Sequence, residues 1–285
     1  MNFRECTQPL PPLQGSLAKL FGAGTLGTKR LLEFAMCTVV ILYRPGHDWP
    51  VIIGSNRDEM ADRPWLPPAR HWDDRAHVVA GRDEMAGGTW LGLNDDGMIA
   101  GILNRINTLG PMEGYRSRGE LPLEALDHAE ADEAVDALTH LETSSYRSFN
   151  MIIADRAKAY WLCALPGKIE AHAIEPGISM LTARDLNDPS SPRTQMYLPQ
   201  FREAEIPGPD SGNWTAWQAL LADKHYDPDS EPGGAMNVDH GGGFGTVSSS
   251  LIALPAPEKI ETKPKWLIAK GRPGEVPYEP VDLGT

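Results

Sequence analysis

The stretch MCTVVILYRPGHDWPVIIGSNRDE, from Met36 to Glu59, decides the fold. It contains two β-branched runs, CTVVILY and VIIGS, on either side of a loop with proline and glycine, and this pattern is typical of a β-hairpin. If the turn lies between Tyr43 and Val51, the numbers of facing residues sum to about 93 or 94. Cys37 then lies opposite Asn56 or Arg57, so the hairpin brings a thiol to a charged cluster.

The composition favours a folded, sheet-rich protein. The chain has 285 residues, of which 41% are hydrophobic, and its 28 glycines and 25 prolines predict many turns and short elements. A formal net charge of -13 argues against a nucleic-acid partner, because binding to phosphates needs clustered Lys and Arg. The three cysteines lack metal-site spacing, so no metal site is predicted and a reducing compartment fits best.

Further strands and helices follow in blocks. Asp62–Gly88 is predicted to be loop-like, and the helical spacing of apolar residues within 120–142 predicts one or two helices. Helices are also predicted at 191–201 and 214–223, and the remaining strands at 89–93, 98–104, 149–155, 159–165, 168–174, 177–182, 245–255 and 265–270. Blocks of strands with inserted helices, in place of strict βαβ alternation, predict an α+β fold.

Residues 1–35 have no sustained hydrophobic period and contain several prolines and glycines. We interpret them as a flexible extension, a propeptide or the product of a start site set upstream of Met36. A single domain is expected over 36–285. The apolar run that ends near Tyr43 is too short to span a bilayer and lacks a small-residue cleavage site, so a cytoplasmic protein is predicted.

The hairpin suggests chemistry at Cys37. A cysteine acts as a nucleophile only as the thiolate; an adjacent guanidinium such as Arg57 lowers its pKa, and Asp58 or Glu59 would hold that guanidinium. The alternatives are a small buried hydrophobic residue at Cys37 and a solvated turn with a surface ion pair at NRDE. The later GRDEMAGG repeats Arg-Asp-Glu without evident chemistry.

MCTVVILY followed by GSNRDE, then GGTWLGLNDDGMIAGILN and SRGELP, resembles the NRDE family, also called the transport and Golgi organisation protein 2 family. The resemblance runs from Met36 to about Leu254. It implies an N-terminal-nucleophile hydrolase fold with four layers, αββα, in which two antiparallel sheets lie between helices. Roles in haem or acyl-lipid handling have been proposed for the family.

A more distant similarity is to conjugated bile acid hydrolases and penicillin V acylases. By this similarity Cys37 is the nucleophile, Arg57 with Asp58 or Glu59 replaces an Arg/Asp pair, and Asn104 in NDDGMIAGILN is an oxyanion-binding residue. Two departures concern polar residues of those enzymes. Ala183 stands where they have a second Asn, with Asn187 a little further on, and Val247 stands where they have a late Arg.

The predicted function is Cys37-dependent hydrolysis of a C–N bond in an acylated small molecule. Asn56, Trp90, Arg118 and Asn187 are candidate substrate-binding residues, although Trp90 also suits the core and Arg118 also suits a solvent-facing loop. The alternative is a binding protein for haem or an acyl-lipid that no longer turns over substrate. No cofactor is required by the first hypothesis, and the sequence leaves the substrate and the oligomeric state open.

Overall fold

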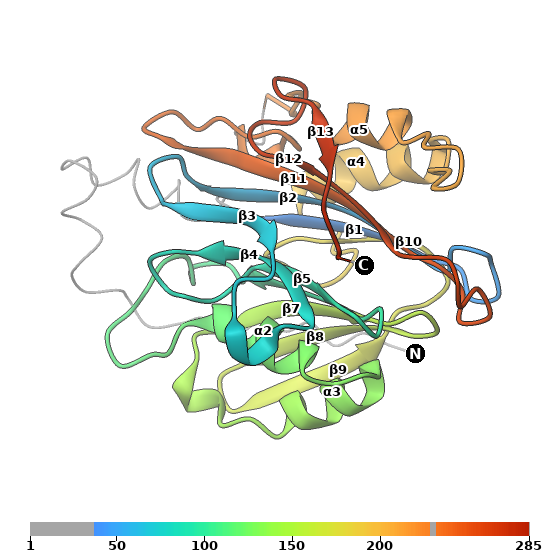
Figure 1. Cartoon of the computed structure of the whole chain (residues 1–285). Coiled ribbons are helices and arrows are strands. Elements are labelled where there is room, and N and C mark those ends of the chain that lie inside the picture. The colour runs from blue at the N-terminus through green and yellow to red at the C-terminus, as the bar shows by residue number, and fades with distance from the viewer. Residues whose placement is uncertain (1–36, 229–231, 285) are drawn as a thin grey trace.

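The computed structural model describes residues 37–228 and 232–284, so the predicted extension over 1–35 lies outside the described residues. Two antiparallel sheets lie face to face, with helices on both outer sides (Figure 1). The fold is therefore α+β with four layers in the order helices, sheet, sheet, helices. This confirms the fold class predicted from the sequence.

The first sheet has six strands in the order β10-β1-β2-β11-β12-β13. Its strands are β1 (Thr38–Tyr43), β2 (Val51–Met60), β10 (Gly177–Leu181), β11 (Phe244–Leu254), β12 (Lys265–Ala269) and β13 (Tyr278–Pro280). The hairpin of β1 and β2 is central to this sheet, because β2 also pairs with β11 over most of its length. The register between β2 and β11 shifts between Thr246 and Ser248, which leaves Val247 as a bulge.

The second sheet has seven strands that follow one another in chain order. They are β3 (Trp65–Ala69), β4 (Val78–Asp83), β5 (Leu91–Asn94), β6 (Ile99–Asn104), β7 (Phe149–Ala154), β8 (Ala159–Leu165) and β9 (Lys168–Ala173). Each strand pairs antiparallel with the next. The connection between β6 and β7 is the long one and carries the helices α2 (Leu121–Leu126) and α3 (Ala131–Thr139).

Helices α2 and α3 cover the second sheet, and α4 (Pro192–Glu203) and α5 (Thr215–Leu221) cover the first (Figure 1). Short 3-10 turns complete the described structure at Asp73–Arg75, Arg118–Glu120, Thr143–Ser145 and Pro232–Gly234. Among the described residues, no helix has the length and apolar character needed to cross a bilayer.

Three apolar clusters separate the layers. The inter-sheet cluster contains Val39, Ile53 and Trp161, with Cys37 packed against it. A second cluster lies between the seven-stranded sheet and α2 and α3, and a third between the six-stranded sheet and α4 and α5. In β1, for example, Val39 and Ile41 enter the inter-sheet cluster and Val40 and Leu42 the third cluster, as the two-residue period of a strand requires.

The region 62–88, predicted to be a loop, contains β3 and β4, so that prediction was wrong. β3 was not predicted because it contains Pro67 and Pro68, and proline is uncommon within strands. The structure places β3 at the edge of its sheet, with a register shift between Leu66 and Ala69, and an edge tolerates proline because one side of the strand needs no donor. The predicted strands at 168–174 and 177–182 are both present but belong to different sheets.

A buried ion pair joins α4 to β2. Arg193, in the first turn of α4, donates to the Asp58 carboxylate from both terminal nitrogens at 3.3 Å, and both side chains are 0% exposed. Arg193 also donates to the Thr38 hydroxyl and to the Gly233 carbonyl. One guanidinium thus connects β1, β2, α4 and the segment that precedes β11.

Replacing Arg193 with Met should lower the free energy of unfolding by about 3–5 kcal/mol, because it leaves the Asp58 carboxylate buried without its counter-charge. Urea unfolding would measure the loss. The matched control is Arg202→Met in the last turn of the same helix, where the side chain is exposed and contacts only the Ile178 carbonyl among the described hydrogen bonds. A loss of about 0.5 kcal/mol is expected there. Equal losses would contradict the structural role of the pair.

Candidate active site

Cys37 lies at the start of β1, beside the NRDE segment of β2. Thr38 faces Asn56 across the hairpin, so the preceding residue, Cys37, stands next to Arg57 and Asp58. The Asp58 N–H donates to the Cys37 sulphur at 3.4 Å, and the thiol lies 3.6 Å from the Asp58 carbonyl oxygen. The hairpin register therefore brings the thiol to the charged cluster. Facing residue numbers sum to 94, the higher of the two predicted values, which places Cys37 opposite Arg57.

The thiol of Cys37 is protonated at neutral pH in this setting. Its pKa is raised to about 12, chiefly by burial and then by the negative charge of Asp58. The Asp58 N–H and then the Arg57 guanidinium lower the pKa by smaller amounts, and Glu59 raises it by the smallest amount. Arg57 thus acts on Cys37 in the expected direction but does not outweigh burial.

Arg57 lies under an aromatic ring. Its side chain is 5% exposed, and its guanidinium carbon lies 4.2 Å from the centre of the Trp90 ring. One terminal nitrogen, Nη2, lies 3.8 Å from Glu59 and 3.7 Å from Asp83. The other, Nη1, is buried without a hydrogen-bond partner among the described residues. Trp90, a candidate substrate-binding residue, therefore holds Arg57 in place.

Asp83 is a site residue that the sequence analysis missed. It lies in GRDEMAGG, which was set aside as lacking chemistry, yet its carboxylate lies 2.7 Å from Arg63 and 3.7 Å from Arg57. Gly81 in the same segment packs on Trp90, since a Cβ at this position would lie 2.4 Å from the ring. The alternation Gly81, Asp83 along β4 was the signal, because residues two apart share one face.

Asp58 faces away from Arg57. Its carboxylate enters the helix-facing layer, where it accepts from Arg193 and from the Thr246 hydroxyl at 2.6 Å. Burial raises the pKa of Asp58 to about 6, although Arg193 and Thr246 favour the charged form. Of the two carboxylates proposed to hold Arg57, Glu59 is the one that lies beside it, and Asp58 contacts Cys37 only through its backbone.

Arg193 is the second site residue that the sequence analysis missed. A basic side chain in the first turn of a helix opposes the helix dipole, and this unfavourable placement was the available signal for a buried carboxylate partner. Thr246 lies next to the Val247 bulge. Val247, which stands where the bile acid hydrolases have an arginine, is therefore the residue at which the strand register shifts, and Thr246 beside it donates to the Asp58 carboxylate.

Two asparagines expected to bind substrate have structural contacts instead. Asn56 is fully buried on the helix-facing side of β2, and its amide donates to the carbonyls of Leu221 and Met236. Asn187 adopts a positive φ of 60°, and its side chain bonds the Met180 N–H and the Ser179 hydroxyl of β10. Neither has a described contact with the Cys37 thiol.

The pairing register does not support the expected approach of Asn104 to Cys37. Asn104, the last residue of β6, faces Phe149, whose ring packs in the cluster against α2 and α3. Cross-strand partners point to the same side of a sheet, so Asn104 belongs to that outer side. Cys37 packs in the inter-sheet cluster. An oxyanion-binding role for Asn104 stays a prediction without a described contact.

Arg118 does lie near the thiol. It donates to the Thr108 hydroxyl at 2.9 Å and to the carbonyls of Ser148 and Thr108 at 3.0 and 2.8 Å. Its pKa is lowered to about 10 by burial and by the positive charge of Arg147, while a charge on Cys37 raises it. Of the four predicted substrate-binding residues, Trp90 and Arg118 belong to the surroundings of Cys37.

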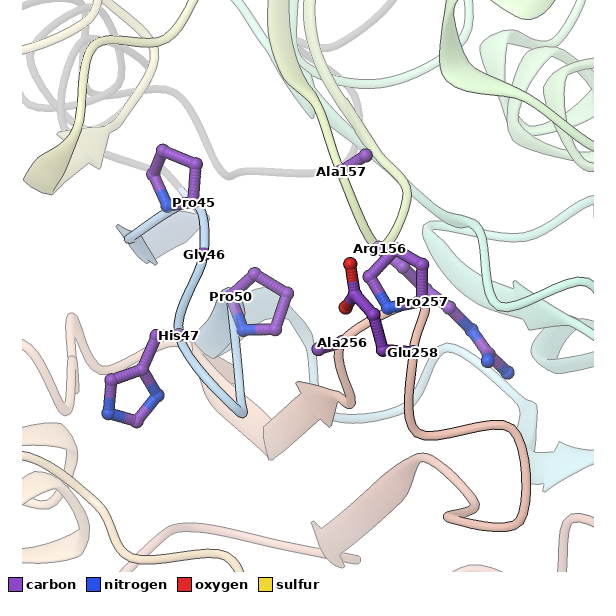
Figure 2. Close-up of a pocket in the computed structure, with 9 residues that line it drawn as sticks. All are labelled: Pro45, Gly46, His47, Pro50, Arg156, Ala157, Ala256, Pro257 and Glu258. Atoms are coloured by element: carbon purple, nitrogen blue, oxygen red, sulfur yellow. The ribbon is translucent and has the colours of Figure 1, made fainter.

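A pocket at the opposite end of β1 is unconnected with this chemistry. Figure 2 shows its walls, which come from the turns after β1, between β7 and β8, and after β11. Its lining includes Pro45, Pro50 and Pro257, and its side chains that can ionise are His47, Arg156 and Glu258. Since Cys37 precedes β1 and Pro45 follows it, the two sites lie at different ends of the strand.

Solved structures with a related arrangement are hydrolases by description. A Caenorhabditis elegans N-acylethanolamine-hydrolyzing acid amidase ortholog aligns with a TM-score of 0.49 and 13% identity, over 79% of this chain and 96% of its own. A variant of conjugated bile acid hydrolase from Clostridium perfringens aligns with a TM-score of 0.49 and 14% identity, over 87% and 94%.

Sequence comparisons identify relatives in mammals. The Transport and Golgi organization 2 homolog of Mus musculus is 30% identical over 132 residues, which cover 42% of this chain and 45% of that protein. The Homo sapiens homolog is 30% identical over 136 residues, or 44% and 47%. The matched segment thus spans slightly less than half the length of these relatives.

The family model described as Transport and Golgi organisation 2 matches residues 36–260. The match covers most of the chain and includes Cys37, the NRDE segment, Trp90 and Arg118. This chain belongs to the Transport and Golgi organisation 2 family.

Proposed function

We propose that this protein is a cysteine hydrolase that cleaves the C–N bond of an acylated small molecule, with Cys37 as the nucleophile. The observation that carries the proposal is the position of the Cys37 sulphur, which accepts from the Asp58 N–H at 3.4 Å. The neighbouring Arg57 guanidinium acts on the same thiol. A thiol, a backbone donor and a fixed positive charge meet at the start of one strand.

The thiol needs a base. A pKa of about 12 leaves very little thiolate at pH 7. Asp58 is turned toward Arg193, and Glu59 accepts from its own neighbour, the Met60 N–H. A free α-amine on Cys37 would fill the need, because an amine with a pKa near 8 takes a proton readily, whereas the nitrogen of a peptide bond is not basic.

The reaction then proceeds in two balanced steps. The α-amine takes the thiol proton, the sulphur attacks the acyl carbon, and the C–N bond breaks as the leaving amine receives that proton. Water next attacks the resulting thioester, which releases the acid and restores the thiol. The Asp58 N–H is the backbone donor beside the reacting sulphur, and one such donor to a developing oxyanion contributes roughly 3 kcal/mol in other hydrolases.

The second candidate is binding of haem or an acyl-lipid without turnover. The observation that favours it is the raised pKa of Cys37, because a buried, protonated thiol is a poor nucleophile. This environment suits an acyl-lipid better than haem, since cysteine ligates haem iron as the thiolate. Turnover of acyl amides by the purified protein, or its absence alongside tight lipid binding, separates the two functions.

Replacing Cys37 with Ser should lower acyl-amide hydrolysis on the order of 10³-fold or more, as loss of a nucleophile does in other hydrolases. Cys163→Ser is the matched control. Cys163 is buried in β8, where Arg105 donates to its sulphur at 3.1 Å, and a serine hydroxyl retains an acceptor for that bond. Rates on a panel of acyl amides measure the difference. Equal losses in two folded variants would rule out Cys37 as the nucleophile.

Alkylation of Cys37 should depend on pH differently in two forms of the protein. With the chain intact before Cys37, the rate should rise about tenfold per pH unit from pH 7 to 10, because the thiol pKa of about 12 lies above this range. In a chain that begins at Cys37, the α-amine should take the thiol proton and the rate should level off below pH 10. Mass spectrometry of the adduct gives both profiles, and amide hydrolysis should accompany only the second form. Hydrolysis by a protein that retains Met1 to Met36 would contradict this mechanism.

A further inference from the structure

Arg118 and Arg147 hold the loop that follows β6 through uncharged oxygen atoms. Arg147 donates to the carbonyls of Asn107, Leu109 and Gly110 at 2.7–2.8 Å. Arg118 donates to Thr108 and to the Ser148 carbonyl. Both guanidinium groups therefore order the segment between β6 and the turn at Arg118–Glu120, and neither bonds a carboxylate in the described part of the chain.

Among the described residues, Arg118 and Arg147 lack a counter-charge although the chain is acidic, with a formal net charge of -13. Two other arginines of low exposure do have acidic partners. Arg193 pairs with Asp58 and Arg105 with Asp185. Arg147 is 9% exposed. The pKa of Arg118 is lowered chiefly by burial and then by the positive charge of Arg147. Burying two cations together without an anion is costly unless a ligand supplies one.

Of the two arginines, Arg118 is the one that interacts electrostatically with Cys37. The Arg118 guanidinium responds to a charge on Cys37, as does Arg57. The backbone joins the two arginines, since the Thr89 N–H donates to the Gly119 carbonyl at 2.8 Å and the next residue, Trp90, covers Arg57. The backbone of Gly119 is thus hydrogen-bonded beside the residue that covers Arg57.

Arg57 supplies an independent observation that points to a ligand. Its side chain is 95% buried, yet Nη1 has no hydrogen-bond partner among the described residues. The carboxylates nearby lie at the other terminal nitrogen: Glu59 and Asp83 approach Nη2 and also serve Arg63. The charges of Arg57 and Arg63 are thus balanced by those of Glu59 and Asp83. The charges of Arg118 and Arg147 are not balanced in this way by any described residue, so the region has an excess of positive charge.

We propose that the space bordered by Cys37, Arg57 and Arg118 binds an anionic oxygen group, a carboxylate or a phosphate, of the molecule that occupies this site. The inference rests on the proposed function for its location and adds the class of ligand: an acylated molecule that carries a negative charge close to its reacting bond. Nη1 of Arg57 would donate to the anion, and Arg118 would supply the counter-charge.

Two alkylating reagents of similar size test this directly. Iodoacetate is an anion and iodoacetamide is neutral, and both transfer their carbon to a thiolate with loss of iodide. The measured quantity is the rate of alkylation by iodoacetate divided by the rate of alkylation by iodoacetamide, at pH 9. This ratio should be about tenfold or more higher for Cys37 than for glutathione, because a buried positive charge attracts the anionic reagent. Mass spectrometry of the Cys37 peptide gives both rates.

Arg118→Met should bring the ratio close to the glutathione value, and Arg118→Lys should restore most of it because the charge returns. Arg116→Met is the matched control, since Arg116 is exposed and pairs with Glu120 at 2.8 Å; it should leave the ratio unchanged. Arg147→Met provides a second variant if Arg118→Met does not fold, and it too should lower the ratio.

A wild-type ratio equal to that of glutathione would overturn the anion site. Failure of both reagents to modify Cys37 would overturn it as well, because the site would then be closed to a small anion. The result is independent of hydrolysis. A protein that prefers iodoacetate but cleaves no acyl amide would refute the proposed enzyme and retain the anion site as part of a binding protein.

Discussion

Arg57 and Asp58 are adjacent, oppositely charged and buried, yet they cannot pair, because consecutive side chains of a strand point to opposite faces of the sheet. Each must therefore find its partners in a different layer. Asp58 obtains Arg193 and Thr246 from the helix-facing side, and Arg57 obtains Trp90, Glu59 and Asp83 on the side between the sheets. The position of α4 and the contact between the two sheets both follow from this division.

Cys37 lies next to both Arg57 and Asp58, and so it is affected by the partners of each. Its sulphur bonds the backbone of Asp58, whose side chain is fixed from the helix layer, and its thiol lies in the field of Arg57, which is fixed from between the sheets. Arg193 reinforces the first arrangement through the hydroxyl of Thr38, the residue after Cys37. The thiol is consequently held by backbone and by neighbours on both faces, so its reactivity depends on residues far from it in the sequence.

Local pattern was sufficient for most of the fold. The hairpin at 38–60, the strands around NDDG and the helices of both outer layers follow from alternation, turn residues and helical spacing. β3 escaped detection because two prolines obscure an edge strand. The position of Cys37 beside NRDE followed from register alone. Asp83, Arg193 and Thr246 did not, because each reaches the site through pairing or packing with distant segments that no local period encodes. The role of Asn104 was suggested by a family motif and stays a prediction, since the described residues show only its pairing with Phe149.

The central position of β2 has a consequence for biosynthesis. Its long edge is completed by β11, which begins at Phe244, and the free edge of β1 is completed by β10, which begins at Gly177. A ribosome adds about 5–20 residues each second, so the nascent chain displays the unpaired edges of the nucleophile hairpin for many seconds before their partners emerge. An unpaired strand edge presents free N–H and C=O groups that pair with strands of other chains. The segment that carries the thiol therefore depends on protection from other chains during synthesis, and truncation before Phe244 would leave the β11-pairing edge of β2 unpaired permanently.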